Sequence, residues 1–160
     1  MTNKGSTMEK MLVVLKPDAL QRRLVGKILG RLERKGVKIT AMKMLQVDTT
    51  RAKEMYSVHK GKDFYEPLLK FITASPVVAM VVEGVDVISI VRAMMGPTFG
   101  PDAPGGTIRG DFGMSRRYNL IHGSDSPESA QREIPIFFDE KEILEYDLVD
   151  DMWIYSSIDK

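Results

Sequence analysis

The stretch Met11-Leu-Val-Val-Leu15, followed directly by Lys16-Pro-Asp18, is the part of the sequence that decides the fold. Five consecutive apolar residues are typical of a strand that is buried on both faces. Residues 24–32 then place apolar side chains at helical spacing, and Gly36 is a suitable stop for that helix. Residues 37–47 begin with alternating apolar and polar side chains, as in a second strand. This order predicts helices packed on a sheet.

The rest of the chain continues the alternation of strands and helices. We expect these elements in chain order: a helix capped by Thr49 or Thr50 and ending near Tyr56, a helix over 65–73, a strand over 77–82, a helix over 87–95, a helix from Pro127 to Glu133 capped by Ser126, a strand over 134–138, a helical stretch over 140–144 and an aromatic end at 153–155. Residues 96–106 form a loop rich in Gly and Pro, and long loops inside compact domains are often functional. The order predicts an α/β or α+β sandwich, with helices on one face of about four strands.

Size and composition indicate one globular domain. The chain has 160 residues, of which we expect 1–8 to be a flexible lead-in and 9–160 to form the domain. Its 23 Lys plus Arg nearly balance its 22 Asp plus Glu, which argues against a protein whose main work is to coat nucleic acid. The lack of cysteine excludes disulfides and a cysteine nucleophile. No apolar run reaches the ~18 residues of a membrane helix, and we expect a cytoplasmic protein.

The densest polar cluster is Asn119-Leu-Ile-His122-Gly-Ser124-Asp125-Ser126. A nucleophilic imidazole needs one nitrogen with a free lone pair and a second nitrogen held by a hydrogen bond. Glu133 lies about two turns along the helix that Ser126 starts, from which it could reach the imidazole. Taken singly, His122 is more often a core or cap residue, and Glu133 more often part of a solvated helix face.

Three cations extend this cluster in the sequence. Lys16 lies at a strand end, Arg92 on a helix and Arg109 after the Gly/Pro loop. Each is by itself more often a surface charge. Together with a nucleophile they have the composition of a triphosphate-binding site.

The cluster resembles the active-site signature of nucleoside diphosphate kinases, N-x-x-H-[GA]-S-D. Further blocks match that family in the same order along the chain: Lys16-Pro-Asp18, Pro76-Val-Val-Ala-Met80, Gly106-Thr-Ile-Arg-Gly-Asp-Phe112, Glu128-Ser-Ala130 and Trp153-Ile-Tyr155. The resemblance covers about Glu9 to Tyr155. It implies a ferredoxin-like sandwich, in which helices pack on an antiparallel four-stranded sheet.

The resemblance also implies a reaction. In that family a histidine takes the γ-phosphoryl group of a nucleoside triphosphate, mainly ATP, and passes it to a nucleoside diphosphate in a ping-pong mechanism. His122 would be that histidine, Glu133 would hold its other nitrogen, Ser124 would support Glu133, and Tyr56 would line the phosphate pocket. Such an enzyme, a phosphoprotein during turnover, would balance nucleotide pools and make CTP, GTP and UTP.

The resemblance assigns nucleotide binding to six residues. They are Lys16 for phosphate and the sugar hydroxyl, Arg92, Thr98 and Arg109 for phosphate, Asn119 for the sugar hydroxyl, and Phe64 for the base. Stacking and phosphate contacts do not distinguish bases, so we expect broad nucleotide use. Mg²⁺ is the implied cofactor, held mainly by substrate phosphates and water, with Asp125 as a residue that could touch its water shell. The implied assembly is a homo-oligomer, either a hexamer or a tetramer.

Two features depart from the family pattern. The prolines of the loop Thr98–Gly106 are shifted, and Arg116 stands where many relatives have a small apolar residue against the base. Arg116 could alter the base pocket or place a cation over the base.

We also expect Arg109→Ala to weaken transfer with the fold intact. The alternatives are a non-catalytic regulator that binds nucleotides or nucleic acid, and a purely structural protein; the complete catalytic set argues against both.

Overall fold

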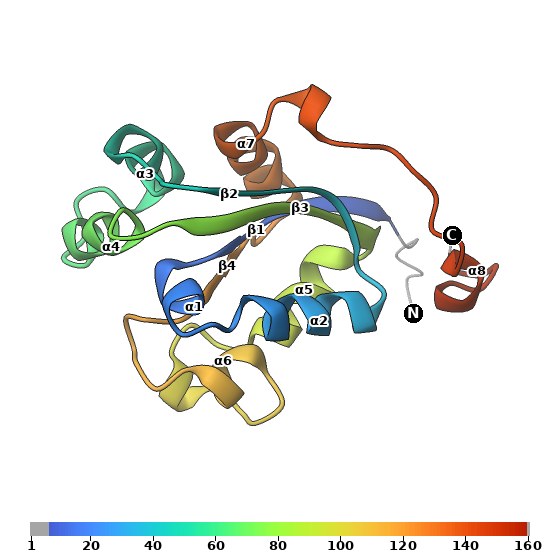
Figure 1. Ribbon diagram of the computed structural model, residues 1–160, viewed down its shortest axis with the longest axis horizontal. Coiled ribbons are helices and arrows are strands. Elements are labelled where there is room, and N and C mark those ends of the chain that lie inside the picture. Colours follow the sequence, from blue (N-terminus) through green and yellow to red (C-terminus); the bar gives the residue numbers. More distant parts are fainter. Residues whose placement is uncertain (1–6, 160) are drawn as a thin grey trace, which may run out of the picture.

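The computed structural model describes residues 7–159 (Figure 1). Four strands of the described chain form an antiparallel sheet in the order β2-β3-β1-β4. Their bounds are β1 (Met8–Leu15), β2 (Lys38–Leu45), β3 (Val77–Val85) and β4 (Ile121–Gly123). The run Met11–Leu15 lies in β1, between β3 and β4, and is fully buried. The part of the sequence that decides the fold is therefore the centre of the sheet.

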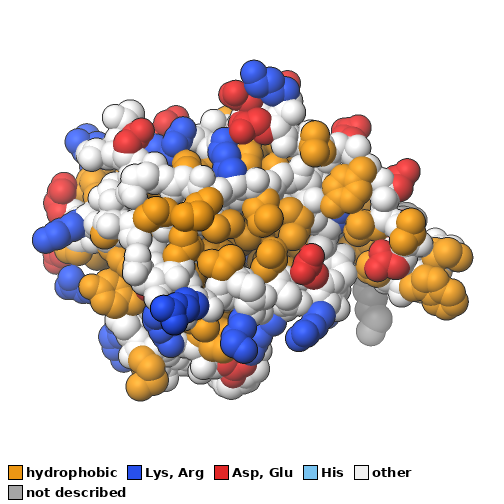
Figure 2. Space-filling model, viewed as in Figure 1, with side chains coloured by type: hydrophobic (Ala, Val, Ile, Leu, Met, Phe, Trp, Pro, Cys, Tyr) orange, Lys and Arg blue, Asp and Glu red, His pale blue; other side chains and the backbone are white. Residues whose placement is uncertain are grey.

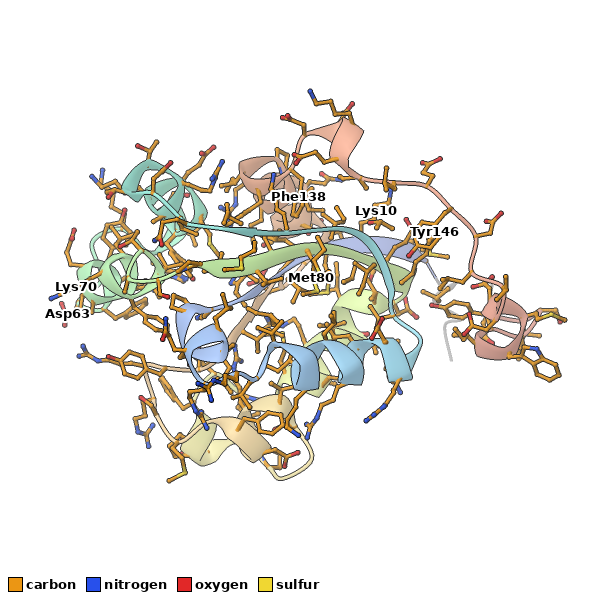
Figure 3. All side chains as sticks on the ribbon, in the orientation of Figure 1. Lys10, Asp63, Lys70, Met80, Phe138 and Tyr146 are labelled. Atoms are coloured by element: carbon orange, nitrogen blue, oxygen red, sulfur yellow. The ribbon has the colours of Figure 1, made fainter. Side chains whose placement is uncertain are left out.

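Helices cover both faces of this sheet (Figure 1). The helices are α1 (Pro17–Gln21), α2 (Val25–Lys35), α3 (Thr49–Met55), α4 (Tyr65–Ile72), α5 (Val87–Met95), α6 (Ile108–Phe112), α7 (Pro127–Phe137) and α8 (Asp151–Ile154), with 3₁₀ turns at Ser57–His59, Gly100–Asp102 and Glu140–Glu142. On one face, Met11 and Val13 pack with α2 and α5, and Figure 3 shows Met80 between the sheet and α2. On the other face, Leu12 and Val14 pack with α3, α4 and α7.

The expected ferredoxin-like sandwich with four antiparallel strands is confirmed, but two details of the expectation are wrong. Helices cover two faces rather than one, because successive side chains of an all-apolar strand point to opposite sides and both need cover. Residues 134–138 are not the fourth strand, since 134–137 continue α7 despite Pro135. Ala130, Glu133 and Phe137 are buried at helical spacing, which holds this segment as a helix against β1. The fourth strand is β4.

Side-chain caps fix where α3 and α7 begin. Ser126 caps α7 as expected, because its hydroxyl accepts the Ser129 N–H at 3.1 Å. The cap of α3 is Asp48 rather than Thr49 or Thr50, since the Asp48 carboxylate accepts the Arg51 N–H at 2.7 Å. A charged acceptor at a helix N-terminus makes the stronger bond.

The structure differs from the expectations near both ends of the chain. Residues 1–6 of the expected lead-in lie outside the described residues, and Met8 already belongs to β1. The expected helical stretch over 140–144 is reduced to the 3₁₀ turn Glu140–Glu142. Within residues 7–159, no helix combines the length and apolar character needed to cross a membrane.

The Gly/Pro loop after α5 is close-packed on itself. Thr107 caps α6 by accepting the Gly110 N–H at 3.0 Å. A Cβ added at Gly110 would lie 1.9 Å from the Pro104 carbonyl oxygen. The Pro104 carbonyl therefore approaches α6 at a distance that only glycine at position 110 permits.

We expect Gly110→Ala to lower the free energy of unfolding by about 1–3 kcal/mol, the usual cost of overpacking. Urea denaturation followed by circular dichroism measures this loss. Gly105→Ala is the matched control, because a Cβ there meets nothing within 4 Å. Equal stability of the two variants would contradict the close packing of the loop.

Candidate active site

His122, Glu133 and Ser124 come together where β4 and α7 meet β1. His122 pairs with Val14 in the register of β1 and β4, and α7 packs over β1. His122 Nε2 bonds Glu133 Oε1, and Glu133 is only 3% exposed. The Ser124 hydroxyl donates to the same carboxylate oxygen at 3.4 Å and accepts the Leu12 N–H at 3.1 Å.

This pairing leaves the two ring nitrogens of His122 in different states. Nε2 is held by a buried carboxylate, whereas Nδ1 has no hydrogen-bond partner among residues 7–159. The His122 side chain is 21% exposed, so solvent and a ligand can reach it. An imidazole fixed at one nitrogen and free at the other has the arrangement of an oriented nucleophile.

Tyr56 stands beside His122 with its hydroxyl unpaired. The two rings meet edge to face, with centroids 6.2 Å apart and planes at 88°. The Tyr56 hydroxyl is buried and has no hydrogen-bond partner in the described chain. Burial, with the charge of Glu133, raises the pKa of Tyr56, so the hydroxyl keeps its proton. A buried donor without a partner is expected to bind a ligand or water at this point.

Lys16, Asn119 and Thr98 form a connected polar group beside the end of β1. The Lys16 ammonium donates to Asn119 Oδ1 at 2.7 Å, and Asn119 Nδ2 donates to the Thr98 carbonyl at 2.9 Å. Burial and the neighbouring charge of Arg109 lower the pKa of Lys16 to about 8. The structure thus brings three of the sequence-predicted residues together.

Arg109 is buried and binds four backbone carbonyls. Its guanidinium donates to the carbonyls of Asn119 at 3.1 Å, Ile121 at 2.6 Å, Gly96 at 3.0 Å and Pro97 at 3.3 Å. Burial and the charge of a second arginine lower its pKa to about 10. Because this side chain also connects the Gly/Pro loop to β4, we expect Arg109→Ala to destabilise the fold rather than to leave it intact.

Arg92 supplies the second arginine from α5. Its guanidinium donates to the Gly123 carbonyl at 3.2 Å, next to His122 in the chain. Arg92 also acts on the charges of Arg109 and Asp125, lowering the pKa of each. The predicted cations thus lie around one site.

Aromatic rings connect this site to the surface. Phe64, at the start of α4, is 49% exposed, and its ring meets His59 edge to face with centroids 5.3 Å apart. The His59 ring lies 6.2 Å from that of Tyr56. His59, which follows Tyr56 by three residues, is one of the two histidines that the sequence offers for histidine chemistry, but the sequence assigns it no role. Its pKa is lowered, first by burial and then by the charge of Lys62.

Arg116 is engaged with the Gly/Pro loop in this structure. Its guanidinium pairs with Asp102 at 3.0 Å and lies 5.2 Å from the centroid of the Phe99 ring. Both members of the ion pair are more than half exposed. The expectation of a cation over the base stays a prediction.

We expect Arg109→Ala to lower the free energy of unfolding by about 3 kcal/mol, because buried carbonyls lose their donors. Chemical denaturation measures this change. Arg116→Ala is the control, since an exposed ion pair contributes about 0–1 kcal/mol. A loss at Arg109 no larger than that at Arg116 would show that the four carbonyl contacts do not hold the loop.

The comparisons with known proteins agree with this geometry. The family model described as nucleoside diphosphate kinase matches residues 9–143. A nucleoside diphosphate kinase of Methanothermobacter thermautotrophicus is 53% identical over 148 residues, which are 92% of this chain and 99% of that relative.

Two solved structures are similar as well. The nucleoside diphosphate kinase of Halobacterium salinarum in complex with CDP has a TM-score of 0.91 at 44% identity and covers 94% of this chain and 100% of its own. That of Borrelia burgdorferi, a transition-state mimic with vanadate and ADP, has a TM-score of 0.85 at 41% identity and covers 91% and 96%. The chain therefore belongs to the nucleoside diphosphate kinase family and is a phosphotransferase with that activity.

Proposed function

We propose that His122 carries the phosphoryl group. Its Nδ1 attacks the γ-phosphorus of a nucleoside triphosphate, mainly ATP; the N–P bond forms as the bond to the bridging oxygen breaks, and the nucleoside diphosphate leaves. A second nucleoside diphosphate then takes the group from Nδ1 by the reverse step. The observation that carries this proposal is the bond between Glu133 and His122 Nε2, which leaves Nδ1 available. The cellular result is a balanced supply of CTP, GTP and UTP, and we place the work in the cytoplasm, where nucleoside triphosphates are consumed.

The surrounding cations and hydroxyl are proposed to bind the phosphates. Lys16, Arg92 and Arg109 supply positive charge, and Tyr56 offers its unpaired hydroxyl to a phosphate oxygen. Charge held in place before the reaction stabilises the transferring group without reorganisation. Thr98 and Asn119 complete the site on the sugar and phosphate side, through the bond between Asn119 and the Thr98 carbonyl.

The base is proposed to stack on the exposed ring of Phe64. Stacking accepts any base, because every base has a π-face. The two similar structures hold CDP and ADP, a pyrimidine and a purine, and this supports broad nucleotide use here.

Enzymes of this family use a divalent metal, and we propose Mg²⁺ bound mainly through the nucleotide. The described residues contain no group of three or more His, Asp or Glu that could hold a metal ion. The Asp125 carboxylate accepts a hydrogen bond from Ser129, which lowers its pKa. An isolated carboxylate such as that of Asp125, which already accepts a hydrogen bond within the protein, suits an ion that is bound by the phosphates and keeps its waters. When bound, the ion neutralises phosphate oxygens.

We also propose that the enzyme is a homo-oligomer, with β2 in the contact. β2 is an edge strand, and Met42 and Met44 on it are 52% and 67% exposed. Figure 2 shows hydrophobic side chains gathered across the middle of this face. The segment that follows α7 covers β2 as far as Lys43. The Leu144 N–H donates to the Thr40 carbonyl at 2.8 Å, and Lys43 pairs with Glu142 at 2.8 Å. The part of the edge beyond Lys43, which carries the exposed Met44, suits a second copy of the same strand. Hexamer and tetramer remain alternatives.

We expect the wild-type protein to gain one phosphoryl group after brief incubation with ATP and Mg²⁺, measured as intact mass after an alkaline quench. The group is lost on addition of CDP or GDP and in mild acid. His122→Ala gains none but still binds ADP, because the lost atom makes the covalent bond rather than the binding contacts.

The variant His59→Ala identifies the histidine concerned, since it still gains the group on His122. A phosphoryl gain by His122→Ala would contradict the proposal. No gain by the wild type, with ADP binding retained, would favour a non-catalytic nucleotide-binding regulator.

We expect removal of Mg²⁺ by a chelator to lower transfer by about 100-fold or more, because charge on the phosphates is no longer neutralised. Calorimetric titration of the protein without nucleotide should detect no Mg²⁺ binding tighter than about 1 mM. Tight binding in that titration would contradict a metal held mainly by the nucleotide.

A further inference from the structure

The turn Asn119–Leu120–Ile121 holds an unfavourable backbone conformation inside the active site. Leu120 has a φ of 71° and is fully buried. The Ile121 N–H donates to the Asn119 carbonyl at 2.8 Å, which closes a γ-turn. A γ-turn with positive φ is rare and strained, and it persists only where its surroundings hold it. This turn separates Asn119 from His122, so its shape sets where both side chains lie.

Three residues hold the turn from outside. The Lys16 N–H donates to the Leu120 carbonyl at 2.8 Å, and Arg109 binds the carbonyls on either side of Leu120. The remaining backbone group, the Leu120 N–H, donates to Asp18 Oδ2 at 3.1 Å. Asp18 is thus the side chain that satisfies the central N–H of the turn.

Asp18 also supplies negative charge that acts on both buried cations of the site, Lys16 and Arg109. Its second oxygen, Oδ1, is buried with no hydrogen-bond partner in the described chain. Burial raises the pKa of Asp18, while the Leu120 N–H and the charge of Lys16 lower it. In return, the charge of Asp18 raises the pKa values of Lys16 and Arg109 against the effect of burial. Two charged groups thus act on the pKa of Lys16: the cation Arg109 lowers it, and the anion Asp18 raises it.

We propose that Asp18 is a positioning residue for phosphoryl transfer: its carboxylate holds the Leu120 turn and balances the charge of Lys16. The inference rests on the proposed function for the identity of the reaction. It assigns Asp18 two separable tasks, one carried by its shape as a hydrogen-bond acceptor and one by its charge. The two tasks predict different results for two substitutions.

The variant Asp18→Asn separates the tasks. The amide oxygen of asparagine can still accept the Leu120 N–H, so the turn and the melting temperature are largely kept. The negative charge is lost, so the pKa of Lys16 falls further below its value of about 8. Lysine attracts phosphate only when protonated, and its protonated fraction falls as pH rises through its pKa. The alkaline loss of nucleotide affinity therefore begins at lower pH, by about 1 unit.

The measurement is the affinity for ADP between about pH 7 and pH 10, by calorimetric titration of the full chain. The wild-type affinity is expected to fall above about pH 8, and that of Asp18→Asn about 1 unit earlier. Asp48→Asn is the matched control, because Asp48 also accepts a backbone N–H near a helix start but caps α3. Its profile should follow the wild type.

A second variant, Asp18→Ala, removes both tasks. It should show the same shift in the pH profile and, in addition, a lower melting temperature because the Leu120 N–H loses its acceptor. Coincident ADP profiles for the wild type and Asp18→Asn would overturn the inference. Failure of the wild type to form phosphohistidine would overturn the proposed function instead, because the ADP profiles do not depend on transfer.

Discussion

The bond between Glu133 and His122 depends on one constraint, which is that β1 is buried on both faces and both edges. β4 pairs with one edge of β1 and carries His122, while α7 packs over the same strand and carries Glu133. A carboxylate that is 3% exposed is costly unless a partner and hydrogen bonds satisfy it. His122 and Ser124 provide those hydrogen bonds. The contacts that compensate for the burial of Glu133 therefore also fix the orientation of the imidazole.

The same end of β1 collects more positive charge than the single carboxylate of Asp18 balances. Lys16 and Arg109 are buried near one another, and burial lowers the pKa of each. Tyr56 adds a buried hydroxyl without a partner in the described chain. Such a site gains more from a polyphosphate than a solvated surface would, because its donors are already desolvated and aimed. The same buried positive charge therefore both attracts the polyphosphate and stabilises the phosphoryl group during transfer.

Strong local patterns made most of the fold predictable from the sequence, and short elements escaped for a physical reason. The apolar run of β1 and the helical spacing of α2 and α5 are long enough to specify their type. β4 has three residues and α6 five, so neither shows a period, and tertiary contacts decide them. The site residues were predictable from motifs, whereas the tie of Arg109 to four carbonyls was not, because spacing carries no information on backbone acceptors.

The departures from local rules gather at one place in the fold. Leu120 is the buried member of the three non-glycine residues with positive φ in the described chain. Within residues 7–159, the two buried side-chain oxygens without partners, on Asp18 and Tyr56, belong to the same site, as does the buried guanidinium of Arg109. The other two non-glycine residues with positive φ, Arg23 and Asp86, are exposed. A sequence selected for stability alone would remove such features, so their concentration around His122 indicates that they are kept for binding and transfer.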